Sequence, residues 1–172
     1  TYAGIAAGAA EVLVPEVRFD VAAVCGRLTQ RHRRGKYSSV VVVSEGALPV
    51  PGADLDAATD ATRSTSVDQF GHARLGGIGA WLAGEIERRT GLEARHTTLG
   101  HIQRGGSPTA YDRVLATRFG VEAVSAVHDG DFAKMVALRA GKIERVPLGD
   151  AVGRPKSLDL SLLEGVAAPF LG

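Results

Sequence analysis

The sequence predicts an α/β fold, an open and mainly parallel sheet with helices on both faces. Two kinds of segment alternate along the chain. Short apolar runs that end at Pro or Gly are typical of buried strands, whereas longer segments with an apolar residue every three or four positions are typical of amphipathic helices. The 172 residues, 45% apolar and 23% charged, suffice for one ordinary core.

Three elements are predicted in the first part of the chain. The alanine-rich stretch from Thr1 to Ala10 predicts a helix, and the apolar run Val12 to Val14, which stops at a proline, predicts a short buried strand. Asp20 is a suitable N-cap for the helix that follows. That helix is expected to end in the basic run Arg31 to Arg34, because cations are favourable at a helix C-terminus.

A second strand and a long loop come next. The continuous apolar run Val40 to Val43 predicts a parallel strand that is covered on both faces. Residues 47–71 are rich in Pro, Gly, Asp, Thr and Ser without a stable period, so they predict a loop with one short helical turn around Asp54 to Ala58. The periodic segment from about Ile78 to Thr90 predicts a helix that closes at Gly91.

The next predicted pair of elements encloses a glycine-rich loop. Glu93 to Leu99 is expected to form a strand that leads into the loop at residues 100–106. Ser107 and Pro108 are expected to be the N-cap and first residue of a helix that runs to about His128. The buried stripe of this helix is expected to comprise Val114, Leu115, Val121, Val124 and Val127.

The last predicted element is a β-hairpin. Met135 to Leu138 and Lys142 to Val146 are the expected strands, and they lie on either side of Ala140-Gly141, which is a suitable two-residue turn. Among the aromatic residues, Trp81 and Phe119 are expected in the core. The alternation of strands and helices predicts right-handed crossovers between parallel strands.

Composition and charge argue against several classes of protein. A formal net charge of +1 gives no strong positive field, so neither nucleic acid nor a membrane surface is an expected partner. No apolar run reaches the roughly 20 residues of a membrane span, and no signal peptide is recognised, which favours the cytoplasm. Cys25 has no disulfide partner and is expected to be buried in a reducing compartment. No metal-ligand spacing relates His32, His72, His96 and His128.

Polar residues follow two predicted strands at the edge where ligands of such sheets gather. Glu45 follows the first, and the segment His101 to Arg104 follows the second. The second segment combines an arginine, whose guanidinium can bind two oxygens of one anion, with a histidine, glycines and a helix N-terminus. This combination predicts a site for an anion such as a phosphate. Arg95 adds a cation near the same edge. A carboxylate cannot bind phosphate but accepts hydrogen bonds from hydroxyls, so the pattern favours a polyol that carries a phosphate.

Each of these residues also has a purely structural interpretation. Glu45 can be a solvated acid at a strand end, and Arg95 can form a surface ion pair with Glu93 that contributes almost nothing. His101 and Arg104 can belong to a tight turn with a structural hydrogen bond.

One long motif resembles a known family. The string Leu99-Gly-His-Ile-Gln-Arg-Gly-Gly-Ser-Pro-Thr-Ala-Tyr-Asp-Arg113 is similar to the signature of the phosphofructokinases, where it forms the fructose 6-phosphate loop and its helix. The segment 128–138 resembles the group of this family whose members use either ATP or pyrophosphate. Further resemblance lies in Tyr2 to Ala9, in Val14 to Glu16 and in Val40 to Gly46.

The resemblance implies a role for each site residue. Glu45 matches the glutamate that binds the hydroxyls of fructose 6-phosphate, and His101 and Arg104 match the pair at its 6-phosphate. Ile102 and Gln103 are assigned to the same ligand segment on position alone.

Arg95 matches an arginine that reaches the substrate of a neighbouring subunit, which implies a homo-oligomer, a dimer or a tetramer. The donor loop, the segment with the catalytic base and the Met-Gly-Arg loop of the family are not found in this sequence. Residues 1–172 are therefore expected to be the C-terminal part of a 6-phosphofructokinase, without catalytic or metal-binding residues and inactive alone. Mg²⁺ is expected to bind through the donor phosphates and the missing N-terminal part.

The resemblance leaves three points open. The donor can be ATP or pyrophosphate. The chain can also be a non-catalytic sugar-phosphate-binding module or a regulatory subunit of a phosphofructokinase. The family's effector site uses a basic loop near the position of Arg33 to Lys36, but this stretch is also an ordinary helix end.

Overall fold

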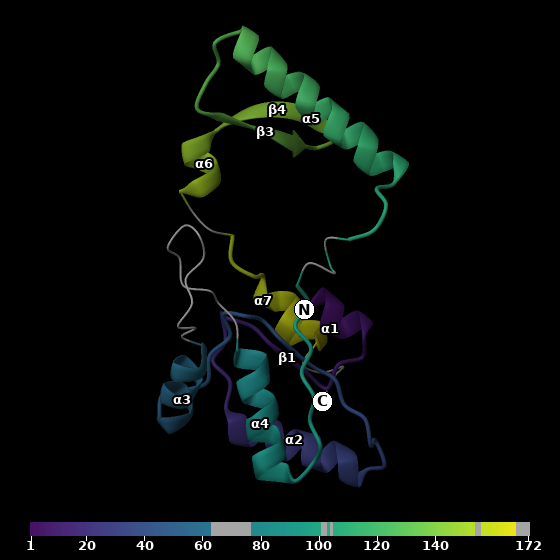
Figure 1. Ribbon diagram of the computed structural model, residues 1–172, viewed down its shortest axis with the longest axis vertical. Helices are drawn as coiled ribbons and strands as arrows, with labels where there is room; N and C mark the ends of the chain where they lie inside the picture. Colours follow the sequence, from purple (N-terminus) through teal and green to yellow (C-terminus); the bar gives the residue numbers. More distant parts are fainter. Residues whose placement is uncertain (63–76, 101–102, 104, 154–155, 168–172) are drawn as a thin grey trace. The chain divides into compact units, whose positions relative to one another are not determined.

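The computed structural model describes residues 1–62, 77–100, 103, 105–153 and 156–167 (Figure 1). The chain divides into two compact units. Unit 1 comprises Thr1–Thr98 with Leu158–Gly172, and unit 2 comprises Leu99–Ser157. Each unit is described by itself.

A parallel strand pair lies at the centre of unit 1. Strand β1 (Glu11–Leu13) pairs with β2 (Val41–Val43), with Leu13 opposite Val43, and α2 (Val21–Arg33) connects them. The predicted parallel arrangement is confirmed. Helix α1 (Tyr2–Ala6) is shorter than expected, because the chain turns at Gly8, whose φ of 60° is left-handed.

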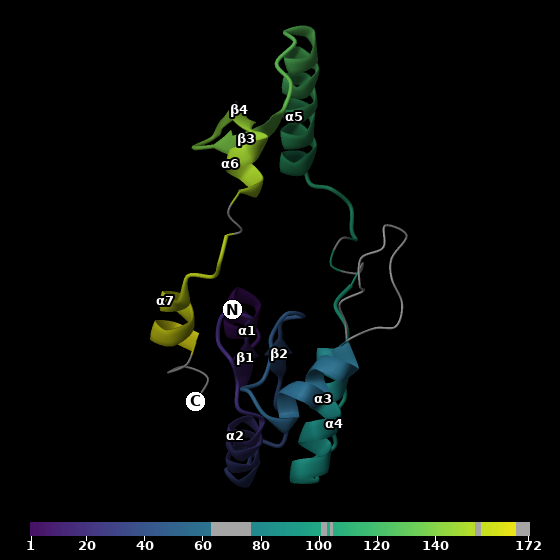
Figure 2. The same cartoon turned by 90° about the vertical axis from the view of Figure 1, so that its left-hand side faces the viewer.

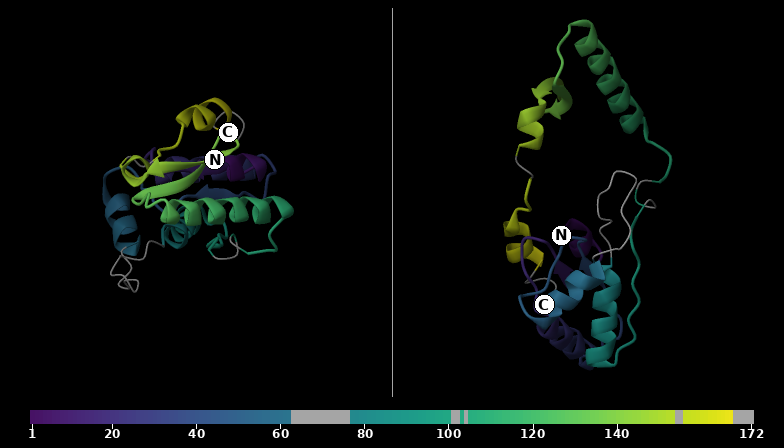
Figure 3. Two further views of the ribbon diagram at one scale, coloured as in Figure 1. Left: turned by 90° about the horizontal axis from the view of Figure 1, so that it is seen from above. Right: turned by 60° about the vertical axis from the view of Figure 1, so that its left-hand side comes forward.

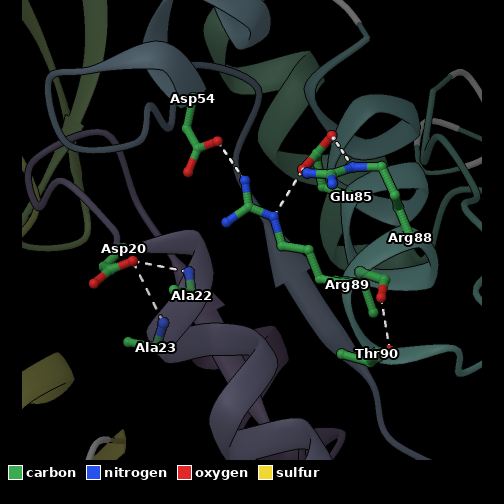
Figure 4. A network of polar contacts seen from close by, with 9 residues as sticks. Asp20, Ala22, Ala23, Asp54, Glu85, Arg88, Arg89 and Thr90 are labelled. Atoms are coloured by element: carbon green, nitrogen blue, oxygen red, sulfur yellow. Dashed lines mark hydrogen bonds and ion pairs between the residues drawn. The ribbon is translucent and has the colours of Figure 1, made fainter.

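Helix α2 begins and ends as predicted. The Asp20 carboxylate accepts hydrogen bonds from the backbone N–H groups of Ala22 and Ala23 (2.8 and 3.4 Å; Figure 4). Its last turn carries the expected basic residues. The side chains of α2 enter the core of unit 1, which comprises Ala10, Leu13, Phe19, Val21, Val24, Cys25, Leu28, Ala47, Ala58, Ile78, Leu82 and Ile86.

Helix α3 corrects one prediction. Residues Ala53–Thr62 form a helix where a loop with a single turn was expected. The stretch is rich in alanine, a strong helix former, but has no regular apolar period. Its helical state is stabilised by contact with α4 (Figure 2) and by burial of Ala58. The rest of the expected loop, 63–71, lies outside the described residues.

Helix α4 confirms its prediction, whereas the expected strand after it is absent. Helix α4 (Ile78–Thr90) ends at Gly91 in the left-handed conformation (φ 69°), and Trp81 is partly buried against the core. Among the described residues, the segment 93–99 pairs with no strand. A strand requires a hydrogen-bonded neighbour, and this largely polar segment has none among the described residues. The prediction of a strand from Glu93 to Leu99 was therefore wrong.

Unit 2 contains one long helix and a hairpin. Helix α5 (Ala110–His128) lies alongside β3 (Lys134–Arg139) and β4 (Lys142–Pro147), which pair antiparallel (Figure 3). The hairpin prediction is confirmed, since Ala140 and Gly141 both have the positive φ (46° and 80°) that a type I′ turn needs. Helix α6 (Leu148–Val152) completes unit 2, whereas α7 (Leu160–Leu162) and η2 (Leu163–Ala167) belong to unit 1.

Two predictions about α5 were wrong. The helix begins at Ala110 with Thr109 as its N-cap, rather than at Ser107 and Pro108. A reciprocal capping box between Thr109 and Asp112 satisfies the first backbone N–H groups and fixes this start. The expected buried stripe is also largely exposed: Leu115 and Phe119 are only partly buried. Exposed fractions of 60, 66, 58 and 63% are found for Val114, Val121, Val124 and Val127.

Candidate functional site

Glu45 lies on a turn directly after β2. The Ser44 N–H donates to the Leu13 carbonyl, and the Ala47 N–H donates to the Ser44 carbonyl, both at 2.9 Å. The first bond ties the turn to the end of β1, as expected where parallel strands end together, and the second closes the turn itself. The Glu45 side chain is exposed, and among the described residues no hydrogen bond or ion pair involves it. The carboxylate is therefore available to accept hydrogen bonds from a ligand.

Arg95 is an exposed side chain that forms an ion pair. Its guanidinium donates to the Glu93 carboxylate at 2.8 Å through Nε and at 2.7 Å through Nη2. The Arg95 and Glu93 side chains are 86% and 70% exposed, so water screens the pair and it stabilises the fold very little. Exchange of Glu93 for an anionic ligand would cost correspondingly little.

A groove of about 490 Å³ in unit 1 lies beside Arg95. Its floor is apolar and is formed by α2, β2 and α4, while its rim carries four basic side chains, His32, Lys36, Arg95 and His96. Tyr37 and the acidic Glu93 also line the groove. Glu45 does not line this groove, so the structure does not bring Glu45 and Arg95 together within it.

A smaller basic cavity of about 120 Å³ lies next to the end of α2. Arg27 forms a bidentate ion pair with Glu11, in which its Nη2 donates to the Glu11 Oε2 at 3.0 Å. The Nε atom of Arg31 is buried and has no hydrogen-bond partner. Arg34 and Lys36 also line this cavity, so the basic run is more than an ordinary solvated helix end. The run of charges was visible in the sequence, but its grouping around a cavity was not.

The glycine-rich loop belongs to unit 2. His101, Ile102 and Arg104 lie outside the described residues. Gln103 is exposed, and its N–H donates to the Gly100 carbonyl at 3.1 Å. Gly106 has a φ of 101°, a conformation that side-chain-bearing residues rarely adopt, so the end of the loop requires glycine.

The loop leads into a firmly capped helix. The Asp112 carboxylate accepts hydrogen bonds from the Thr109 N–H and hydroxyl, both at 2.8 Å, and these bonds hold the pKa of Asp112 below its ordinary value. The start of α5, where the helix dipole is positive, is therefore held in place directly after the loop.

Arg89 links α4 to α3 (Figure 4). Its guanidinium contacts Asp54 of α3 and donates to Glu85 of α4 at 2.8 Å, while Arg88 donates to Glu85 at 2.6 Å. These hydrogen bonds, with that from Arg88 the strongest, hold the pKa of Glu85 below its ordinary value. Cys25 is buried as expected, and burial raises the pKa of its thiol.

The part of the chain that the structure describes holds no group of three or more His, Cys, Asp or Glu side chains able to bind a metal ion. The helices within the same ranges are all too short or too polar to cross a membrane.

Comparison with known proteins identifies the family. Residues 1–127 match the family described as Phosphofructokinase. A pyrophosphate–fructose 6-phosphate 1-phosphotransferase of Streptomyces coelicolor is 53% identical over 169 residues, which are 98% of this chain and 47% of that protein. An ATP-dependent 6-phosphofructokinase of Mycobacterium tuberculosis is 49% identical over 168 residues, again 98% and 47% of the two chains.

Solved structures of phosphofructokinases are also similar to this chain. Saccharomyces cerevisiae phosphofructokinase matches 98% of this chain and 19% of its own, with a TM-score of 0.54 and 28% identity. Pichia pastoris phosphofructokinase in the T-state matches 97% of this chain and 15% of its own, with a TM-score of 0.52 and 29% identity. The chain belongs to the phosphofructokinase family, and the predicted α/β fold class is confirmed. It spans about half the length of the curated relatives it matches.

Proposed function

We propose that this chain supplies the sugar-phosphate site of a 6-phosphofructokinase. The enzyme would transfer a phosphoryl group from ATP or pyrophosphate to the 1-hydroxyl of fructose 6-phosphate, giving fructose 1,6-bisphosphate in glycolysis in the cytoplasm. The observation that carries the proposal is the family match over residues 1–127, which includes Glu45, Arg95 and the whole loop 100–106.

Glu45 would bind the sugar hydroxyls. Its carboxylate is exposed on a turn whose backbone is tied to β1, and none of the described side chains competes for its oxygens. A carboxylate held in this way accepts hydrogen bonds from two neighbouring hydroxyls without moving the main chain. This supports Glu45 as a recognition residue rather than an incidental acid.

The loop would bind the 6-phosphate. His101 and Arg104 are proposed to donate hydrogen bonds to the phosphate, with Ile102 and Gln103 as the remaining residues of the ligand segment. The positive φ of Gly106 and the capped start of α5 support this role, because they fix where the loop meets the positive end of a helix dipole.

Arg95 would bind the substrate of a neighbouring subunit in a homo-oligomer, a dimer or a tetramer. The exposed guanidinium is held only by the weak surface pair with Glu93, so a phosphate could replace that partner at little cost.

The remaining parts of the reaction are assigned outside this chain. We propose that residues 1–172 correspond to the C-terminal part of the enzyme, and that the catalytic base and the donor site belong to the rest of the polypeptide. Magnesium would enter with the donor phosphates and stabilise their charge. Relatives of both donor types have similar identity, so the donor is ATP or pyrophosphate. This chain would hold and orient the sugar for in-line attack.

Calorimetric titration tests the site. The chain is expected to bind fructose 6-phosphate but not fructose, and Arg104→Ala should weaken binding about ten- to two-hundred-fold. Arg139→Ala, an exposed arginine on the hairpin, is the matched control and should leave affinity unchanged. Unchanged affinity in Arg104→Ala together with a lower melting temperature would show that Arg104 is structural.

A chimera tests turnover. In it, this chain replaces the matching region of the Streptomyces coelicolor relative. The chimera is expected to phosphorylate fructose 6-phosphate with pyrophosphate, whereas the chain alone is expected to be inactive with either donor. A chimera that binds the sugar phosphate without turnover would favour the non-catalytic binding module.

A further inference from the structure

The segment that joins the glycine-rich loop to α5 is exposed along its whole length. Each residue from Gly105 to Pro108 is exposed, and none of them forms a hydrogen bond with another described residue. Gly106 has a φ of 101°, and a Cβ added there would meet no atom within 4 Å. Among the described residues, therefore, no packing contact holds this segment in place.

The residue types of the segment limit how it can move. Proline fixes its own φ at about −65° and restricts the residue before it to extended conformations, so Ser107 and Pro108 form a stiff pair. Gly105 and Gly106, by contrast, belong to the most flexible residue type. Because the stiff pair directly precedes Thr109, the end of the loop follows the position of Thr109.

Thr109 is itself held by the first turn of α5. The Asp112 carboxylate accepts hydrogen bonds from the Thr109 N–H and hydroxyl, and the Asp112 N–H donates to the Thr109 hydroxyl at 3.2 Å. The Arg113 N–H donates to the Thr109 carbonyl at 3.1 Å. Every polar group of Thr109 therefore has a partner, and bonds to a charged carboxylate are stronger than neutral ones.

The other end of the loop has no comparable anchor in the part of the chain that the structure describes. The segment 93–99 pairs with no strand there, and the bond from the Gln103 N–H to the Gly100 carbonyl lies within the loop. Ordering a free segment during binding costs conformational entropy, so a loop that is already fixed at one end binds its ligand more tightly.

We propose that Thr109 and Asp112 are positioning residues for sugar-phosphate binding, because their capping box fixes the end of the loop that carries His101 and Arg104. Neither of the two side chains would contact the ligand. The inference rests on the proposed function, since it requires the loop to bind the 6-phosphate. The competing interpretation is an ordinary helix cap, which adds stability and leaves affinity unchanged.

Calorimetric titration of the chain with fructose 6-phosphate tests the proposal, together with a thermal melt of every variant. Thr109→Val preserves the shape of the side chain but removes its hydroxyl, and Asp112→Ala removes the carboxylate. Each is expected to weaken binding about three- to tenfold, less than Arg104→Ala, because the groups that bind phosphate are still present. The two changes combined should cost no more than the larger single change, since both break the same capping box.

A rescue variant and a matched control separate positioning from stability. Thr109→Ser retains the hydroxyl and should bind within about twofold of the unmodified chain. Asp20→Ala removes the N-cap of α2 in unit 1, where the Asp20 carboxylate accepts from the Ala22 N–H at 2.8 Å. It should lower the melting temperature by a similar amount and leave affinity for fructose 6-phosphate unchanged.

A pair of glycine variants provides the measurement if the cap variants do not fold. Gly106→Ala and Gly130→Ala both place a Cβ on left-handed backbone, with φ of 101° and 67°, and neither Cβ meets an atom within 4 Å. Both therefore act through the backbone alone. Gly106 lies between the loop and the cap, whereas Gly130 follows the other end of α5. Only Gly106→Ala is expected to weaken binding.

The same variants in the chimera described above should raise the KM for fructose 6-phosphate by similar factors and leave the KM for pyrophosphate unchanged. If Arg104→Ala weakens sugar-phosphate binding while Thr109→Val and Asp112→Ala lower only the melting temperature, the capping box is purely structural. This inference then fails and the proposed function stands. An equal loss of affinity in Asp20→Ala would show general destabilisation and would also overturn it. If neither the unmodified chain nor the chimera binds fructose 6-phosphate, the proposed function fails, and the inference fails with it.

Discussion

Units 1 and 2 are ordered by different forces. Unit 1 closes an apolar core around a parallel strand pair, to which β1, α2, α3 and α4 contribute buried side chains. Unit 2 is held by local polar contacts. Arg145 of β4 contacts Glu122, Asp129 and Asp131 at 2.6, 2.8 and 3.3 Å, and Arg118 donates to the Gly141 carbonyl at 3.0 Å.

This difference shows that regular secondary structure and independent stability are separate properties. Helix α5 is among the most clearly delimited elements of the chain, with a capping box at its start, yet none of its residues is fully buried. Local bonds determine where an element begins and ends, whereas burial of apolar surface provides most of the free energy that keeps it folded.

The sharpest test of the comparison is truncation of one apolar side chain in each unit. Leu82→Ala in the core of unit 1 should reduce the free energy of unfolding by about 2–5 kcal/mol, because it leaves a cavity. Val124→Ala in α5 should change it by less than about 0.5 kcal/mol in the chain alone. Urea unfolding measures both. Similar losses would mean that the two units share one core.

A second test removes the polar clamp of unit 2. The hydrogen bonds that Arg145 donates to neighbouring carboxylates, the one to Asp129 first, raise its pKa, so the guanidinium stays charged. Arg145→Ala should speed amide hydrogen exchange in β3 and β4 and leave exchange in α2 unchanged. Arg139→Ala, on the same hairpin, should have a smaller effect. Faster exchange throughout unit 1 as well would contradict the separation of the two units.

The smallest expected effect is a pH dependence in unit 1. The bonds to Glu85 from Arg88 and Arg89 lower its pKa from the ordinary 4.5. A carboxyl whose pKa is lower in the folded state stabilises that state fully above pH 4.5 and loses this contribution as the pH falls through the folded-state pKa. Glu85→Gln should therefore flatten the fall in urea midpoint below pH 4.5, whereas the exposed control Glu87→Gln should not. An unchanged pH profile in Glu85→Gln would show that this network adds no stability.

Parts of the candidate site could be predicted from the sequence, because they lie at the ends of elements that local sequence patterns predict. Glu45 lies at the end of β2, as its position after a continuous apolar run indicated. The exposed pairing of Arg95 with Glu93 was one of the two interpretations left open by the sequence, and the structure contains that pair. The roles of His101, Ile102, Gln103 and Arg104 in binding phosphate stay predictions.

The sequence by itself determined the features that depend on neighbours along the chain. The N-cap of α2, the glycine that ends α4, the two-residue turn at Ala140-Gly141 and the family motif all act within a few residues, so local patterns predict them. Only the tertiary structure decided the helical state of 53–62, the absence of a strand at 93–99 and the exposure of four valines of α5, Val114, Val121, Val124 and Val127. Pairing and burial are relations between elements far apart in sequence, and a single segment does not contain them.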